Sequence, residues 1–282
     1  MKTIHISTTD GLSVAASLFI PEGTPRAGVI INSATAVGRG FYAAFAEHLS
    51  KHGYLAISYD YRGIGDSLNV TADISKFSMR AWGELDFEAV IQWATSSFTN
   101  IEWHCVGHSV GGQLVGLAPS NSALHSVYCI AAQNGYWKNW GVKKRFKLLL
   151  TWYLLIPLLN RAFGHIPKHF FGEIIPGPIA KEWARWCRNP HYICDKNGEP
   201  LRSYFAQYTK KMLFLAIDDD LQFAPLKAVK ALHDFYSNAE REIRRIEPEK
   251  FGLKKIGHFG FFKQKNKPLL WSDTLDWLNQ FQ

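Results

Sequence analysis

Continuous apolar runs alternate with stretches of helical periodicity along most of the chain. "AGVIIN" (27–32) and "MLFLAI" (212–217) have the pattern of strands that are buried on both faces of a sheet. "FYAAFAEHLSKHG" (41–53) and "WGELDFEAVIQWATSS" (82–97) instead repeat apolar residues at helical spacing. Strands that alternate with helices predict an α/β fold, in which a mostly parallel sheet carries helices on both faces.

The remaining elements are predicted from the same patterns. Two strands at 3–7 and 12–19 are joined by Asp10-Gly11, a dipeptide that is typical of hairpin turns. Further strands are predicted at 54–61, 101–107, 126–132 and 242–246, and further helices from Gly111, at 225–237 and at 268–281.

The alternation stops between residues 134 and 208. This segment is rich in aromatic, proline and basic residues and shows no clear strand, which predicts a mainly helical insertion. We therefore divide the chain into an α/β core, residues 1–133 and 209–282, and a helical cap insertion, residues 134–208. A length of 282 residues suits one large α/β domain with an insertion better than two equal domains.

The most apolar run of the insertion is Leu148–Leu159. It is shorter than the roughly 20 apolar residues of a membrane span, and Pro157 is expected to interrupt it. Three roles stay open for this run: a buried helix, the lining of a pocket for an acyl group, or an interfacial helix beside a membrane. Packing is favoured over membrane contact.

The formal net charge of +8 is distributed unevenly. No Asp or Glu lies between Glu102 and Glu173, whereas this stretch holds seven Lys and Arg residues. Such a segment can attract an anionic substrate or a membrane surface, or it can be a solvated basic face. No nucleic-acid-binding motif accompanies it. We therefore expect a small-molecule substrate and no nucleic acid, and no pattern indicates an oligomeric state.

Several classes of protein are disfavoured by the remaining motifs. The start of the chain, "MKTIHISTTDGLSV", lacks the pattern of a signal peptide, so a cytoplasmic location is expected. The four cysteines are expected to be reduced and buried. Cys187 and Cys194, with His191 between them, do not have a zinc spacing, and "DYRGIGDS" (60–67) lacks the lysine of a phosphate loop. We expect no metal and no cofactor.

One serine stands in Gly-x-Ser-x-Gly spacing, in "CVGHSVGGQL" (105–114), between a predicted strand and a predicted helix. In such a place the serine occupies a sharp turn, and Gly107 and Gly111 avoid collisions with the adjacent strand and helix. Ser109 would then lie at the carboxyl edge of the sheet as a nucleophile. The alternative is a small residue in a loop of small residues.

A serine hydroxyl needs a base to take its proton. His258, in "KKIGHFGFF", follows the last predicted strand at the same edge of the sheet, although it could instead be a locally bonded loop histidine. Asp218, Asp219 and Asp220 follow the strand at 212–217, and the order Ser, Asp, His is the order of this architecture. Asp220 lies furthest past the strand and is favoured over Asp219, because only one of three adjacent carboxylates is expected to approach the imidazolium.

The oxyanion that forms when a nucleophile attacks a carbonyl needs two backbone N–H donors. One candidate is Val110, which directly follows Ser109. The second should come from the loop after the strand at 27–32, "NSATAVGRG" (32–40). We favour Thr35, with Ala34 and Ala36 as alternatives.

Together these motifs resemble the α/β-hydrolase superfamily, and within it the serine-aminopeptidase-like and monoglyceride-lipase-like branch. The resemblance is carried by "LFIPEG", "FYAAFAEHLSKHGY", "YDYRGIGDS", "GHSVGGQL", "DDDLQFAP" and "IGHFGFF", and it covers roughly residues 10–135 and 210–282. It implies an eight-stranded, mostly parallel sheet with a cap inserted after the sixth strand. It also implies that Ser109 is the nucleophile, His258 the base and Asp220 the acid.

Two departures from the family pattern concern the site. Ser33-Ala34 replaces the usual His-Gly after the third strand, and the acid-bearing loop lacks a frequent glycine. The resemblance implies a serine hydrolase acting on an ester or related acyl bond, and the aromatic, basic insertion suggests an apolar acyl group. The alternatives are an acyltransferase that uses the same three residues and a non-catalytic ligand-binding relative.

Overall fold

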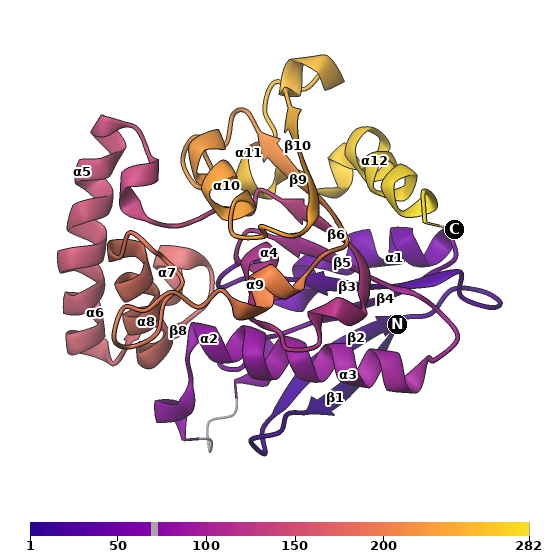
Figure 1. Cartoon of the computed structure of the whole chain (residues 1–282), viewed down its shortest axis with the longest axis horizontal. Coiled ribbons are helices and arrows are strands. Elements are labelled where there is room, and N and C mark those ends of the chain that lie inside the picture. The colour runs from indigo at the N-terminus through magenta and orange to yellow at the C-terminus, as the bar shows by residue number, and fades with distance from the viewer. Residues whose placement is uncertain (69–72, 282) are drawn as a thin grey trace.

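A computed structural model describes residues 1–68 and 73–281 of the chain (Figure 1). Its main sheet has eight strands in the order β1-β2-β4-β3-β5-β6-β9-β10. β2 pairs antiparallel with β1 and β4, and all other neighbours are parallel, which confirms the predicted mostly parallel α/β fold. The strands are β1 Lys2–Ser7, β2 Ser13–Phe19, β3 Ala27–Asn32, β4 Tyr54–Tyr59, β5 Trp103–His108, β6 Leu124–Ile130, β9 Lys211–Ile217 and β10 Glu240–Ile246.

The central strands are covered on both faces. Every residue of β3, β4 and β5 is buried, which explains their continuous apolar sequences. The helices α1 (Ala43–Lys51) and α12 (Lys267–Asn279) pack together through the rings of Phe45 and Trp271, whose centroids are 5.4 Å apart. Figure 1 shows α12 above the strands β3 and β5 and α3 (Glu88–Ser97) below them.

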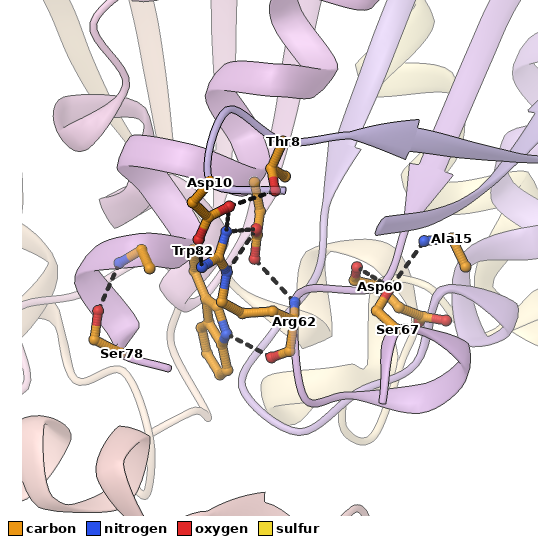
Figure 2. A network of polar contacts seen from close by, with 10 residues as sticks. Thr8, Asp10, Ala15, Asp60, Arg62, Ser67, Ser78 and Trp82 are labelled. Atoms are coloured by element: carbon orange, nitrogen blue, oxygen red, sulfur yellow. Dashed lines mark hydrogen bonds and ion pairs between the residues drawn. The ribbon is translucent and has the colours of Figure 1, made fainter. Parts of the chain in front are cut away.

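The loop after β4 is fixed by a buried arginine. The Nε of Arg62 donates to Asp86 Oδ1 at 2.8 Å, and its guanidinium lies 2.7 Å from Asp10 Oδ2 in the β1–β2 turn. The indole of Trp82 donates to the Arg62 carbonyl at 3.0 Å. Figure 2 shows the Arg62 side chain close to Asp10 and Trp82. The segment 60–67 thus ties the first hairpin to the helical stretch after residue 78, and a buried pair of this kind is strongly destabilising when one partner is removed.

Residues 134–208 lie between β6 and β9 and are largely helical. Figure 1 shows the helices of residues 142–188 gathered on one side of the sheet, at the left of the view. Two short antiparallel strands, β7 (His165–Ile166) and β8 (Ile175–Pro176), also occur here, and two residues are too few to give an alternating sequence pattern. The helical pieces are α5 Val142–Leu150, the π-helical η8 Thr151–Leu155, α6 Ile156–Phe163, α7 Lys168–Phe171, α8 Gly177–Arg188 and α9 Ser203–Gln207.

Residues 142–163 form one continuous helix, so the expectation that Pro157 interrupts the apolar run is wrong. The π-helical turn Thr151–Leu155 ends just before this proline, which is the second residue of α6. The hydrogen bonds therefore change from the five-residue spacing of a π-helix to the four-residue spacing of an α-helix close to the residue that has no N–H to donate. The helix has 22 residues and is the one helix of the described chain with the length and hydropathy of a membrane span.

In the C-terminal half, the helix α10 covers Leu226–His233. It is shorter than the predicted helix at 225–237, because the chain turns at Asp234–Tyr236.

His104 on β5 generates a prediction about stability and pH. Its Nδ1 lies 2.9 Å from the Ser126 hydroxyl, and its Nε2 has no hydrogen-bond partner among the described residues. Burial, with smaller contributions from His125 and Lys210, lowers the pKa of His104 to about 4. An unfolded histidine titrates near pH 6.5, so the unfolded chain binds more protons between these values. The neutral form of His104 therefore contributes to stability at neutral pH, and this contribution is lost as the pH falls through about 6.5 towards 4.

We therefore expect the free energy of unfolding of the wild type to fall more than that of His104→Gln when the pH is lowered from 7 to 5. The two decreases should differ by about 2 kcal/mol, because His104 binds a proton more readily in the unfolded chain than in the folded one. Urea unfolding at both pH values measures it. An identical pH dependence in the two proteins would contradict the assignment.

Candidate active site

Ser109 occupies a strained turn between β5 and α4 (Val110–Leu114). Its backbone has φ +54° and ψ −116°, a conformation that is unfavourable for a residue with a side chain. The Ser109 N–H donates to the carbonyl of Ile130 on β6 at 2.9 Å, which fixes the turn to the sheet. The side chain is largely buried but lines a cavity at the carboxyl edge of the sheet.

Two glycines leave the space that this turn requires. A Cβ on Gly107 would lie 2.6 Å from the backbone nitrogen of Gly112. A Cβ on Gly111 would lie 2.3 Å from the carbonyl oxygen of Asn32 at the end of β3. Both contacts are with backbone atoms that cannot rotate away, so a side chain at either position would separate α4 from the strands.

The three aspartates after β9 have three different partners. Asp220 Oδ2 lies 2.5 Å from His258 Nδ1, and both side chains are buried. The Asp219 carboxylate accepts the backbone N–H groups of Ile256 at 3.0 Å and Gly257 at 2.8 Å. Asp218 instead pairs with Arg245 of β10 at 2.6 Å. Asp220 thus contacts the imidazole itself, whereas Asp219 holds the backbone that leads to it.

His258 lies in the short helix α11 (Gly257–Gly260) and lines the same cavity as Ser109. Its Nδ1 donates to Asp220, so Nε2 is the nitrogen left to exchange a proton with a neighbouring group. The ring of Phe223 packs against the imidazole with a centroid distance of 4.9 Å. The structure therefore brings Ser109, Asp220 and His258 together from three segments that are distant in sequence.

The backbone amides of Val110 and Thr35 have no acceptor among the described residues. Val110 is the first residue of α4, where an N–H group has no intrahelical acceptor. Thr35 lines the cavity, and its amide has no acceptor in the parts of the chain that the structure describes. The Ala34 amide is already bonded to the Tyr42 hydroxyl at 2.8 Å. Of the three candidates in this loop, Ala34 is thus the one whose N–H already donates a hydrogen bond within the protein.

A buried chain of hydrogen bonds links these loops through Tyr42 and His108. Tyr42 Oη lies 2.8 Å from His108 Nδ1, and His108 Nε2 lies 2.9 Å from the carbonyl oxygen of His258. Burial, followed by the nearby His258, lowers the pKa of His108 well below its usual range. The ring is therefore neutral: Nε2–H donates to the His258 carbonyl, and Nδ1 accepts the Tyr42 hydroxyl.

No pattern in the sequence predicts a role for Tyr42 or His108. His108 stands 66 residues from Tyr42 and 150 from His258, and no local pattern connects these positions. The one available signal is that His108 directly precedes Ser109.

The cavity has a volume of about 460 Å³ and is closed on one side by residues 140–192. Its wall there is mainly apolar, and Trp183 packs edge-on against Trp152 with centroids 4.8 Å apart. Lys144 and Lys147 also line it, and none of the lining residues described is Asp or Glu. Partial burial and then the neighbouring Lys147 lower the pKa of Lys144. The apolar lining contributed by these residues consists of Trp140, Leu148, Trp152, Leu155, Phe170, Phe171 and Trp183.

All four cysteines are buried, as predicted, and none of them is in a disulfide. Across residues 1–68 and 73–281, no three side chains of His, Cys, Asp or Glu are grouped so that they could hold a metal ion.

Comparisons with known proteins agree with this architecture. Residues 23–159 match the family model Hydrolase_4, described as "Serine aminopeptidase, S33", a stretch that includes Ser109 but ends before Asp220 and His258. No curated protein matches the sequence.

Among solved structures, the chain is similar to an esterase, EaEST, from Exiguobacterium antarcticum, at 16% identity and a TM-score of 0.64, with 99% of this chain and 100% of that one covered. It is also similar to mouse alpha/beta hydrolase domain-containing protein 10, at 15% identity and a TM-score of 0.62, over 100% of both chains. Est1E from Butyrivibrio proteoclasticus, in a structure with ferulic acid bound, matches at 15% identity and a TM-score of 0.60 over 98% of both chains.

The hydrogen bonds through Tyr42 and His108 predict that loss of the Tyr42 hydroxyl destabilises the protein. Tyr42→Phe removes the hydroxyl that serves both the Ala34 amide and His108 Nδ1, so two buried polar groups lose their partner. We expect the free energy of unfolding to fall by about 1–3 kcal/mol. Chemical denaturation of both proteins measures this change.

Tyr153→Phe is the matched control for Tyr42→Phe, because Tyr153 is half exposed on the helix 142–163. It is expected to change stability by less than about 0.5 kcal/mol. Equal effects of the two substitutions would contradict a structural role for the Tyr42 hydroxyl.

Proposed function

The chain belongs to the α/β-hydrolase superfamily, and from that premise we propose that it is a serine esterase that hydrolyses esters of an apolar acyl group. The observation that carries the proposal is the 2.5 Å contact between Asp220 and His258, at a cavity that Ser109 also lines. A serine, a base and an orienting carboxylate are the parts that acyl transfer to a serine requires.

In this mechanism, Ser109 Oγ attacks the ester carbonyl while His258 Nε2 takes its proton. Asp220 holds the imidazole by Nδ1 and stabilises its cationic form. The amides of Val110 and Thr35 donate to the oxyanion of the tetrahedral intermediate. His258 then returns the proton to the departing alcohol, and an acyl group stays on Ser109. Water, deprotonated by His258, attacks this acyl group and releases the acid and the free serine.

The cavity favours an ester with an apolar acyl group over a peptide substrate. Its volume and aromatic wall suit a small apolar molecule, and Est1E, a similar protein, has been solved with ferulic acid bound. An aminopeptidase must hold the positively charged amino terminus of its substrate. The described lining offers Lys144 and Lys147 and no carboxylate near them, so a cationic group is disfavoured there. The two lysines favour a substrate whose polar part is anionic.

Labelling with a fluorophosphonate probe tests the nucleophile. Wild-type protein should be labelled covalently, and Ser109→Ala should not, because the probe reacts with an activated serine hydroxyl. Thr151→Ala is the control, since this hydroxyl also lines the cavity but bonds to the Lys147 carbonyl at 2.9 Å. Labelling of Ser109→Ala, or no labelling of folded wild type, would refute the proposal.

Ester hydrolysis by two aspartate variants separates the roles of neighbouring carboxylates. Asp220→Asn should lower kcat on the order of 10⁴-fold, because an amide does not hold the imidazole in the productive tautomer. Asp219→Asn should cost less than about a hundredfold, because its partners are backbone amides and the loss comes from a shifted His258 loop.

Circular dichroism verifies that both aspartate variants are folded. A larger loss of kcat in Asp219→Asn than in Asp220→Asn would reverse the assignment of the acid.

A further inference from the structure

The helix of residues 142–163 has an apolar face that no other part of the described chain covers. Only 17% of its most apolar 18-residue window is buried. Every fourth residue along it is apolar and exposed, and Val142 and Phe146 are 78% and 68% exposed. We call these five residues the outer stripe: Val142, Phe146, Leu150, Leu154 and Leu158.

The opposite side of the same helix lines the cavity. Leu148, Thr151 and Trp152 face the space that also contains Ser109 and His258. The inner residues therefore account for the substrate-binding wall, and the outer stripe is not needed for that purpose. A monomeric protein that leaves a row of large apolar side chains in water normally uses them to bind a partner.

Positive charge surrounds the outer stripe. Lys143 is exposed in the first turn of the helix, and Arg161 and Lys168 are exposed near its end. The sequence contains no Asp or Glu between Glu102 and Glu173, so no acid of this segment neutralises them. Apolar side chains flanked by cations match a bilayer surface, where the former enter the boundary of the acyl chains and the latter meet lipid phosphates.

The positive charge near the outer stripe also disfavours two other arrangements, a dimer through this face and a transmembrane helix. A second copy of the chain, joined through the same face about a two-fold axis, would bring these cations together, which costs free energy. A transmembrane course would carry Lys143, Lys144 and Lys147 into the bilayer and would pull the inner residues away from the cavity. A helix that lies in the plane of the interface avoids both costs.

We propose that the outer stripe docks this protein on the surface of membranes that contain anionic lipids. This inference concerns binding and is independent of the proposed esterase activity. Docking in this orientation places the helix 142–163 between the bilayer and the cavity.

Co-sedimentation with vesicles tests the proposal. The full chain should bind vesicles of phosphatidylcholine with phosphatidylglycerol at least tenfold more tightly than vesicles of phosphatidylcholine alone. Raising the salt concentration should reduce this preference, because exposed charges are screened. Lys143→Gln/Arg161→Gln/Lys168→Gln should lose it, since each cation near an anionic surface contributes about a factor of five.

A triple variant tests the apolar contribution. Phe146→Gln/Leu154→Gln/Leu158→Gln should weaken binding to the anionic vesicles at least tenfold, by removing apolar area from the interface. The matched control, Ile20→Gln/Ile74→Gln/Leu269→Gln, changes three exposed apolar residues elsewhere and should bind as the wild type does. All the substituted side chains are exposed, so the variants should fold, and circular dichroism checks this.

Three results would overturn the proposal. They are no sedimentation of the wild type with anionic vesicles at low salt, equal loss of binding in the triple variant and its control, and a wild-type dimer in light scattering that the triple variant makes monomeric. Ser109→Ala should bind vesicles as the wild type does, so a failure of docking and a failure of the proposed catalysis are distinguishable.

Discussion

The backbone of Ser109 is the constraint on which the rest of the site depends. A positive φ at a residue with a side chain costs on the order of 1–3 kcal/mol, and it persists only when its surroundings enforce it. Here the enforcement comes from β5, which is buried along its whole length, and from the bond between the Ser109 amide and Ile130 on β6. The contacts of Gly107 and Gly111 leave no space for the turn to relax. Strain at one residue is thus supported by three neighbouring strands.

The same constraint extends to the loops around the turn. His108 cannot move independently of Ser109, and it is bonded to the carbonyl of His258 and to the hydroxyl of Tyr42. Tyr42 in turn bonds to the amide of Ala34, next to the candidate oxyanion donor Thr35. Loops that follow β3, β5 and β10 therefore share one buried polar path. A neutral His108 is essential to this path, because both of its ring nitrogens are engaged in fixed directions.

The sequence predicted correctly those elements whose pattern lies in adjacent residues. The continuous apolar runs of β3 and β9, the Asp10-Gly11 hairpin and the glycine spacing around Ser109 each depend on adjacent residues, and the structure has these elements at the predicted places. Long-range pairing was not readable in the same way. The separate partners of Asp218, Asp219 and Asp220 depend on how β10 and the His258 loop return to β9, and the bond between Tyr42 and His108 depends on the packing of α1. The helix through Pro157 was missed because a π-helical turn has no simple sequence pattern.

The two apolar faces of the helix 142–163 limit how this protein can change. An ordinary surface helix has an outer face on which substitutions are nearly neutral, so its inner face can be adjusted without other effects. In this helix Leu148 and Trp152 face the cavity, while Phe146 and Leu154 face outward a few residues away on the same rigid rod. A substitution that tilts or rotates the rod moves both sets at once. Selectivity for the molecule inside the cavity and the character of the outer surface are therefore linked traits, and they are expected to vary together among descendants of this sequence.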